Sequence, residues 1–129
     1  MFRFKVQAGS VTGKDHLLRQ SNCQDKFSLA EVEIKGETYL VGVVCDGCGS
    51  GRHSEIGAGL LAHFLTQEIA RQLTKGIPLE WLPDQLYRAA LQYLRRIFKG
   101  ICPSNPEHAR LVLADFLLTT VLGFVMNER

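Results

Sequence analysis

The chain has 129 residues, of which 46% are hydrophobic and 22% are charged. This balance is typical of one globular domain and excludes a wholly disordered chain. Fifteen Lys and Arg residues against thirteen Asp and Glu residues leave a formal net charge of +2, which is too small to indicate nucleic acid as the partner.

The sequence shows no sign of export or of membrane insertion. Its first residues alternate between polar and apolar types and lack the apolar run of a signal peptide. The longest apolar stretch, residues 111–126, contains Asp115 and is shorter than the roughly twenty residues that a membrane helix needs. The four cysteines are unevenly spaced and do not suggest a disulfide framework. We therefore expect a cytoplasmic protein with reduced thiols and no membrane partner.

The first part of the chain predicts three strands. Residues 2–8 alternate with a period of two, and Lys26–Ile34 and Thr38–Cys45 are rich in β-branched and aromatic residues. Lys35–Gly36 suits a two-residue hairpin turn, so the last two strands should pair antiparallel. The alternation slips at Leu29–Ala30, which indicates a bulge. The second hairpin strand is apolar on both faces, which indicates a central strand.

The second part of the chain predicts two helices and one more strand. The glycine-rich loop 46–53 precedes a helix over residues 54–73, with Ser54 as its N-cap. A second helix covers residues 83–98, and residues 116–126 read as a buried strand. This last strand looks central, and a central strand needs partners on both sides. The sequence therefore predicts part of a larger sheet.

Two aspartates are the most informative candidates for a site. The turn places Ile34 opposite Glu37 and, counting back along both strands, Asp25 opposite Asp46. Opposed side chains have Cβ atoms about 4.5–5.5 Å apart, where two carboxylates repel unless a cation or a shared proton relieves them. Hard cations such as Mg²⁺ and Mn²⁺ prefer oxygen ligands. We therefore predict a metal site here; the alternative is two loop aspartates that cap turns.

The loop that follows offers two further hypotheses. Residues 47–51 alternate glycine with small side chains, which would let the backbone approach a phosphate at a helix N-terminus. The Gly-Lys-Ser/Thr of a phosphate-binding P-loop is absent. Cys45 and Cys48 have a C-x-x-C spacing, which suits a redox pair or half of a zinc site. The alternative is that both are structural cysteines.

Basic residues gather on the second predicted helix without an acid among them. Three of them, Arg88, Arg95 and Lys99, share a face, and Arg96 lies beside them. Such a cluster is usually a solvated helix face, and we favour that interpretation over nucleic-acid binding.

Three motifs carry a resemblance to a known family. They are Cys23-Gln24-Asp25, then Val43 to Gly51 with its Asp-Gly-Cys-Gly-Ser-Gly run, and then Thr119-Thr120-Val121-Leu122. In this order they resemble the motifs of the metal-dependent protein phosphatases of the 2C type, most closely those of the bacterial subgroup. The likeness extends from about Ala8 to Val125.

The resemblance implies an α+β fold, an antiparallel β-sandwich flanked by helices, with two Mn²⁺ or Mg²⁺ ions at one edge. It implies that Asp46, the backbone carbonyl of Gly47 and Asp25 are metal ligands. The implied reaction is hydrolysis of a phosphomonoester, in which a water that bridges the metal ions attacks a phosphoserine or phosphothreonine of a protein substrate.

Three positions depart from the family pattern. Gln24 stands where many members have a Glu that helps to hold a metal, and Cys48 stands where some have a histidine proposed as the general acid. The phosphate-binding arginine of the family would fall near Gln20, so Arg19 is the candidate for that role.

The family's later aspartate motifs are missing. We therefore expect residues 1–129 to be the N-terminal portion of a single phosphatase domain, truncated before a C-terminal half that would complete the metal site. The alternative is a non-catalytic binding or regulatory remnant of the same fold. A redox or zinc module at Cys45 and Cys48 is a third interpretation.

Overall fold

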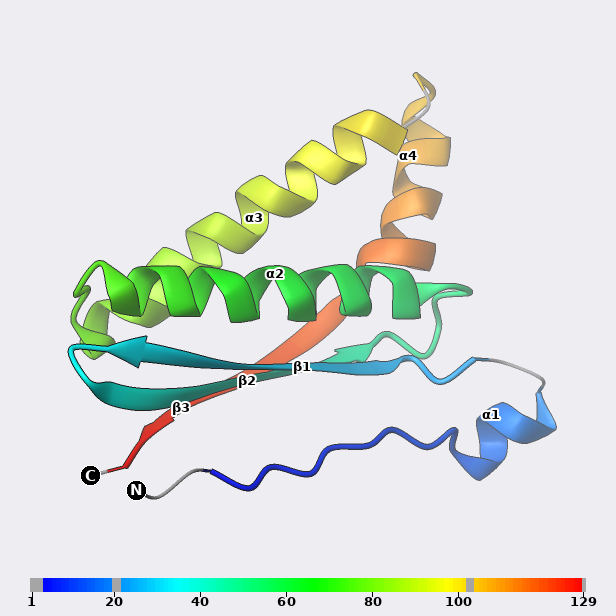
Figure 1. The fold of residues 1–129 in the computed structure, drawn as a ribbon. Helices are drawn as coiled ribbons and strands as arrows, with labels where there is room; N and C mark the ends of the chain where they lie inside the picture. The colour runs from blue at the N-terminus through cyan, green and yellow to red at the C-terminus, as the bar shows by residue number, and fades with distance from the viewer. Residues whose placement is uncertain (1–3, 20–21, 102–103, 129) are drawn as a thin grey trace.

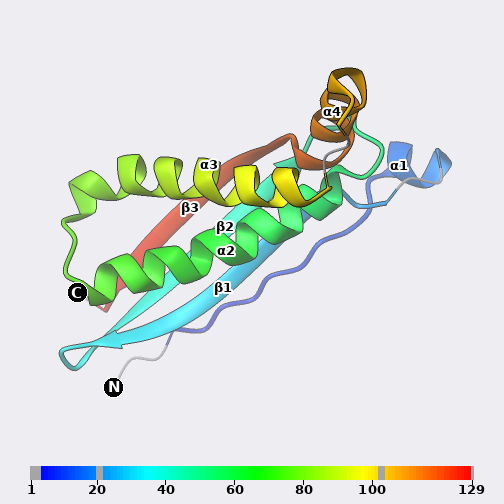
Figure 2. The same ribbon diagram turned by 90° about the horizontal axis from the view of Figure 1, so that it is seen from above.

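The computed structural model describes residues 4–19, 22–101 and 104–128. Its centre is an antiparallel sheet with the strand order β1-β2-β3, made of β1 (Asp25–Ile34), β2 (Glu37–Gly47) and β3 (Thr119–Asn127). The long helix α2 (Ser54–Thr74) lies along one face of this sheet, and a second long helix, α3 (Leu82–Ile101), lies on the same side and packs against α2 (Figure 1). Seen from above, α3 lies beside α2 on the side of β3 (Figure 2). The short elements are α1 (Lys14–Leu18), a 3-10 turn η1 (Leu79–Trp81), α4 (Pro106–Val112) and a π-helical turn η2 (Leu113–Leu117).

The β1–β2 hairpin has the predicted turn and pairing. Lys35 and Gly36 have φ values of 53° and 81°, and two positive φ values are what a type I′ turn requires. The register then continues without interruption from Ile34 opposite Glu37 to Asp25 opposite Asp46. The bulge predicted at Leu29–Ala30 is wrong, because Leu29 points to the face opposite α2 and both faces of β1 carry apolar residues.

The hydrophobic core lies between β2 and α2. Val41, Val43 and Cys45 point toward the helix and are almost wholly inaccessible to solvent. Leu61, Leu65, Ile69 and Leu73 of α2 pack on them, and α3 adds Leu82, Leu86, Ala90 and Leu94. Within the described part of the chain, we find no helix with both the length and the apolar character needed to cross a membrane.

Two strand predictions are corrected by the structure. Residues 4–8, the described part of the predicted strand 2–8, have no regular secondary structure and run beside β1 (Figures 1 and 2). An alternating segment becomes a strand only when a neighbour pairs with it, and alternation does not specify that neighbour. The strand predicted over 116–126 begins at Thr119 after the π-helical turn, and β3 forms an edge of the described sheet rather than its buried centre.

The face of the sheet opposite α2 is open and largely apolar. Phe27, Val44 and Phe124 are each more than two-fifths exposed, and Leu122 is 75% exposed. Because side chains alternate along each strand, Asp25 and Asp46 lie on this same face. The α+β class is thus confirmed, whereas the described residues form one sheet, so the second sheet of the predicted sandwich stays a prediction.

Candidate metal site

Asp25 and Asp46 are directly paired where β1 begins and β2 approaches its end. The predicted register is therefore confirmed. Partial burial of the carboxyl, its hydrogen bond with Asp46 and the negative charge of Asp46 together raise the pKa of Asp25. The positive charges of His16 and Lys26 act in the opposite direction. The neighbouring carboxyl thus disfavours the ionised form of Asp25 in the folded protein.

A hollow of about 510 Å³ lies against the aspartate pair on the open face of the sheet. It is lined by residues 7–11 together with Asp25, Phe27, Val44 and Asp46. The N-terminal segment is tied to the start of β1, because the Ser10 hydroxyl donates to the backbone carbonyl of Asp25 over 3.4 Å. The pair is therefore accessible from solvent through a pocket that is large enough for an ion and several waters.

The start of β3 holds the backbone around Asp46. The Thr119 hydroxyl donates to the Asp46 carbonyl over 2.9 Å, and the Thr120 hydroxyl reaches the same oxygen over 3.4 Å. The amide of Cys48 donates to the Leu118 carbonyl over 2.9 Å. Threonines seventy residues away thus fix the position of Asp46, a role that the spacing of the sequence does not reveal.

Glycine is required at position 47 because the Gln24 backbone and Ser54 lie too close to leave room for a side chain. A Cβ atom at this position would lie 2.7 Å from the Ser54 hydroxyl and 2.9 Å from the Gln24 carbonyl. The Gly47 amide donates to that Gln24 carbonyl over 3.2 Å. Ser54, which we expected to be an N-cap, is instead the first residue of α2, and its hydroxyl donates to the Cys48 carbonyl over 2.9 Å. These contacts hold the strand-to-helix loop tightly against β1.

Gln24 supports this loop from the side opposite the aspartates. Its side chain is buried, and its Nε2 donates to the Gly51 carbonyl over 2.8 Å. Its Oε1 is buried and has no hydrogen-bond partner among the residues that the structure describes. Because consecutive side chains point to opposite faces, Gln24 faces the loop while Asp25 faces the hollow. Gln24 is therefore a loop-positioning residue.

The donor atoms present suit a hard cation. Two carboxylates and the adjacent Gly47 carbonyl are all-oxygen ligands of the type that Mg²⁺ and Mn²⁺ take, and the raised pKa of Asp25 shows a pair that a cation would relieve. Across the residues that the structure describes, no cluster contains three or more His, Cys, Asp or Glu side chains placed to hold a metal. The fit is thus to part of a coordination sphere.

Comparison with protein families identifies the family of this chain. The family profile of protein phosphatase 2C matches residues 12–129, which is most of the chain. The chain belongs to the protein phosphatase 2C family. No curated protein and no solved structure gives a significant match. The resemblance drawn from the three sequence motifs is therefore confirmed at the level of the family.

Arg19, the candidate phosphate ligand of this phosphatase-family chain, lies at the end of α1. It is exposed, and its backbone amide donates to the Asp15 carbonyl over 3.1 Å. Among the described residues, the structure gives its guanidinium no ion pair with either aspartate, so its role stays a prediction. His16, one turn earlier, does act on the site because its charge lowers the pKa of Asp25. Sequence reasoning missed His16, although it lies in the segment that precedes the first phosphatase motif.

The two cysteines of the phosphatase loop occupy different environments. Cys45 belongs to the core under α2, and burial raises the pKa of its thiol to about 11. Cys48 lies in the loop, where hydrogen bonds from Ser50 lower the pKa of its thiol. A redox or zinc pair needs two thiols that reach the same partner, so the burial of Cys45 in the core disfavours a redox or zinc module at these two cysteines. Cys102 lies outside the described residues.

Proposed function

We propose that Asp25, Asp46 and the Gly47 carbonyl hold a Mn²⁺ or Mg²⁺ ion in the catalytic site of a protein serine/threonine phosphatase. The observation that carries this proposal is the pairing of Asp25 with Asp46 on the open face of the sheet. Membership of the protein phosphatase 2C family gives the reaction class. The substrate is then a phosphoserine or phosphothreonine of another protein.

Each residue of the candidate site has a defined part in this proposal. A bound divalent ion supplies positive charge that lowers the pKa of water and offsets the charge of the phosphate. Asp25 and Asp46 provide the negative charge that retains the ion, and Thr119 holds the Asp46 backbone through its 2.9 Å hydrogen bond. Arg19, at the end of α1, is the candidate ligand of the phosphate oxygens, since a guanidinium can make two parallel hydrogen bonds to a phosphate.

We also propose that residues 1–129 form the N-terminal portion of one phosphatase domain. Two features support this. The aspartate pair lacks a third carboxylate among the described residues, and the apolar face around Phe27, Val44 and Leu122 is open. A second sheet packed on that face would complete the sandwich and could bring further ligands to the ion. We therefore expect this chain alone to hydrolyse p-nitrophenyl phosphate feebly or not at all with Mn²⁺, and rapid turnover would contradict the missing-ligand argument.

Calorimetric titration of the chain with Mn²⁺ tests the site directly. We expect binding that Asp46→Asn abolishes, because the substitution removes the negative charge that retains the ion. Glu33→Gln is the matched control, since Glu33 lies on the same face of β1 but far along the strand. Binding that is the same in the wild type and in Asp46→Asn would contradict the proposal.

The second candidate function is a non-catalytic binding or regulatory role on the phosphatase scaffold. The small number of carboxylates at the site favours it. If this alternative holds, Mn²⁺ binding that saturates and depends on Asp25 and Asp46 should not be found. If the metal site is retained, such binding should be found. The same titration therefore separates the two functions.

A further inference from the structure

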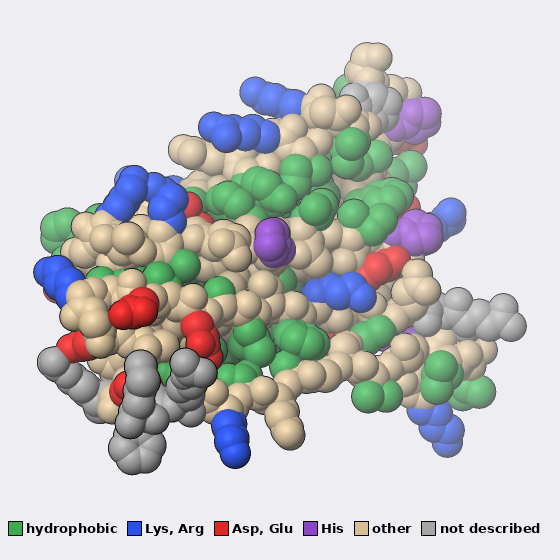
Figure 3. Space-filling model, viewed as in Figure 1, with side chains coloured by type: hydrophobic (Ala, Val, Ile, Leu, Met, Phe, Trp, Pro, Cys, Tyr) green, Lys and Arg blue, Asp and Glu red, His purple; other side chains and the backbone are tan. Residues whose placement is uncertain are grey.

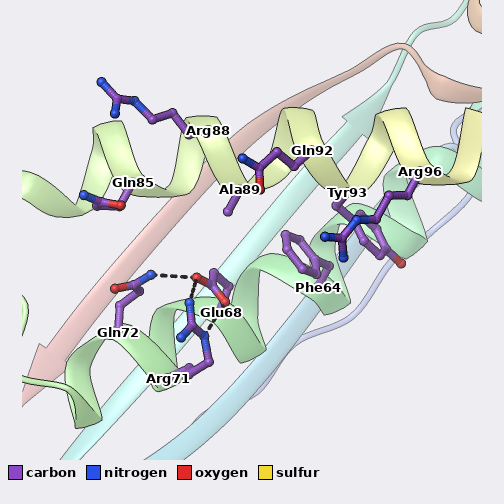
Figure 4. Close-up of a pocket in the computed structure, with 10 residues that line it drawn as sticks. All are labelled: Phe64, Glu68, Arg71, Gln72, Gln85, Arg88, Ala89, Gln92, Tyr93 and Arg96. Carbon is purple, nitrogen blue, oxygen red and sulfur yellow. Dashed lines mark hydrogen bonds and ion pairs between the residues drawn. The ribbon is translucent and has the colours of Figure 1, made fainter.

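A second hollow lies between α2 and α3, on the helical side of the molecule. It has a volume of about 420 Å³ and is lined by side chains of both helices. Figure 4 shows these side chains as sticks, with α3 contributing one wall and α2 the other. The aspartate pair is on the opposite face of the sheet, so this groove is separate from the candidate metal site. We call it the α2–α3 groove.

The groove carries more positive than negative charge. Its single lining carboxylate, Glu68, is buried and fully engaged. Arg71 makes two hydrogen bonds to it, one of them from Nε over 2.7 Å, and Gln72 Nε2 donates to it over 2.7 Å. These hydrogen bonds, above all those from Arg71, lower the pKa of Glu68 despite its burial. Glu68 is thus neutralised within the wall and cannot offset other cations.

Two arginines of the groove have no carboxylate partner among the described residues. Arg88 and Arg96 both line it from α3, and across residues 4–19, 22–101 and 104–128 the structure records no ion pair for either. In Figure 4 the Arg96 side chain extends toward the end of the groove where Phe64 and Tyr93 lie, while the Arg88 side chain extends from α3 away from α2. The sequence places Arg88, Arg95 and Lys99 on one face of the helix, whereas in the structure Arg88 and Arg96 are the residues of α3 that bring positive charge to the groove. Figure 3 shows Lys and Arg side chains along the outer side of α3.

The remaining lining groups are hydrogen-bond donors and an aromatic wall. Gln85 and Gln92 line the groove between and beside the two arginines, and each amide can donate two hydrogen bonds. At one end, the rings of Phe64 and Tyr93 stack with centroids 4.1 Å apart and planes 3° from parallel. A groove lined by two arginines that have no ion pair among the described residues, by several amide donors and by a flat apolar end suits an anionic ligand that also has apolar groups.

We propose that the α2–α3 groove binds an acidic peptide segment of a partner protein. Arg88 and Arg96 are eight residues apart on one helix, so their backbones are about 12 Å apart along its axis. An extended peptide covers this distance in about four residues, which sets the spacing of the two acidic side chains. A nucleic acid fits less well, because the chain's net charge is only +2 and the groove is short. The proposal does not depend on phosphatase activity.

Fluorescence anisotropy with the full chain tests this proposal. The probe is a labelled eight-residue peptide with two glutamates four positions apart and one phenylalanine, and the comparison peptide has glutamine in place of both glutamates. EDTA in the buffer removes any contribution from the metal site. We expect the acidic peptide to bind at least about tenfold more tightly than the neutral one, with a strong decrease in affinity as salt rises.

Two double variants of equal charge separate the groove from general electrostatics. Arg88→Gln with Arg96→Gln should weaken binding of the acidic peptide at least about tenfold. Arg95→Gln with Lys99→Gln removes the same charge from the same helix outside the groove and should change binding less than about twofold. Thermal melts check that both fold, and the single variants of Arg88 and Arg96 replace the double variant if it melts early.

Three results would overturn the proposal. They are equal binding of the acidic and neutral peptides, equal losses in the two double variants, and displacement of the peptide by a short oligothymidylate at lower concentration than by unlabelled peptide. Because the assay contains no metal, each of these results leaves the proposed phosphatase site untouched. Conversely, failure of Mn²⁺ binding would leave this proposal standing.

Discussion

Asp25 and Asp46 lie opposite each other across the β1–β2 pair and share a hydrogen bond. For stability alone this is an unfavourable arrangement, because partial burial and the neighbouring Asp46 make ionisation of Asp25 less favourable in the folded protein than in the unfolded chain. This carboxyl pair disfavours folding by itself, and a bound cation would remove the repulsion between the two carboxylates. Such an arrangement is typical of a functional site. The stability of the protein should therefore depend on both pH and metal binding through this one pair.

Asp25→Asn should raise the melting temperature in EDTA at pH 7 and should remove the stabilisation that Mn²⁺ gives. The folded-state pKa of Asp25 lies above its ordinary value of 3.8. Its contribution to stability is therefore fully present below pH 3.8 and is lost as the pH rises through the raised pKa. Consequently the advantage of Asp25→Asn should shrink on acidification. Differential scanning fluorimetry between pH 3 and pH 8 checks this, with Glu33→Gln as the control that should show neither effect.

Glu68→Gln should destabilise the protein at neutral pH but not in acid. The hydrogen bonds and charge of Arg71 hold the pKa of Glu68 below its ordinary 4.5. The stabilisation by Glu68 is therefore present above pH 4.5 and is lost as the pH falls through the lower, folded-state pKa. Urea unfolding of both proteins across this range should give curves that converge in acid. A difference that stays constant with pH would show that the carboxylate charge is not involved.

Gly57→Ala and Gly59→Ala should have opposite effects, although both lie in α2. A Cβ at Gly57 would lie 2.3 Å from the Phe116 carbonyl, whereas at Gly59 it would make only ordinary contacts with Lys26 at 3.6 Å and beyond. We expect Gly57→Ala to cost about 1–3 kcal/mol of unfolding free energy through overpacking. Gly59→Ala should gain about 0.5–1 kcal/mol because alanine favours the helix. Chemical denaturation measures both changes in unfolding free energy. If Gly57→Ala does not lower the unfolding free energy, η2 does not pack closely against α2 at this position.

Thr119→Val should weaken Mn²⁺ binding, and Thr119→Ser should not. Valine keeps the shape of threonine but removes the hydroxyl that donates to the Asp46 carbonyl. We expect a loss of about 1 kcal/mol in stability and a severalfold lower affinity for Mn²⁺, because the Asp46 backbone is less well held. Serine retains the donor. Equal affinities in the valine and serine variants would show that this hydrogen bond has no part in positioning the site.

The hairpin and its aspartate pair could be predicted from the sequence because a short turn determines a register. Lys35–Gly36 leaves one favoured two-residue turn, and every pairing back to Asp25 and Asp46 then follows by counting. The wrong bulge has a physical cause as well. Phe27 and Leu29 are apolar on a face that the described residues leave open, so the expected alternation between an apolar and a polar face does not hold in β1.

The contacts that shape the loop could not be predicted, since they come from distant segments. The π-helical turn η2 places the Asp115 carbonyl where it accepts from the His53 amide over 2.9 Å, and it also packs on Gly57. The Asp46 carbonyl is held by Thr119. No spacing rule relates these residues, because tertiary contacts between segments so far apart in the chain depend on packing that the local sequence does not specify.

Anomalous diffraction from crystals soaked in saturating Mn²⁺ tests the central claim most directly. We expect a manganese peak within about 2.5 Å of carboxylate oxygens of both Asp25 and Asp46, and its loss in Asp46→Asn crystals treated in the same way. Well-ordered aspartate side chains with no manganese between them, or a peak bound elsewhere that persists in Asp46→Asn, would contradict the account.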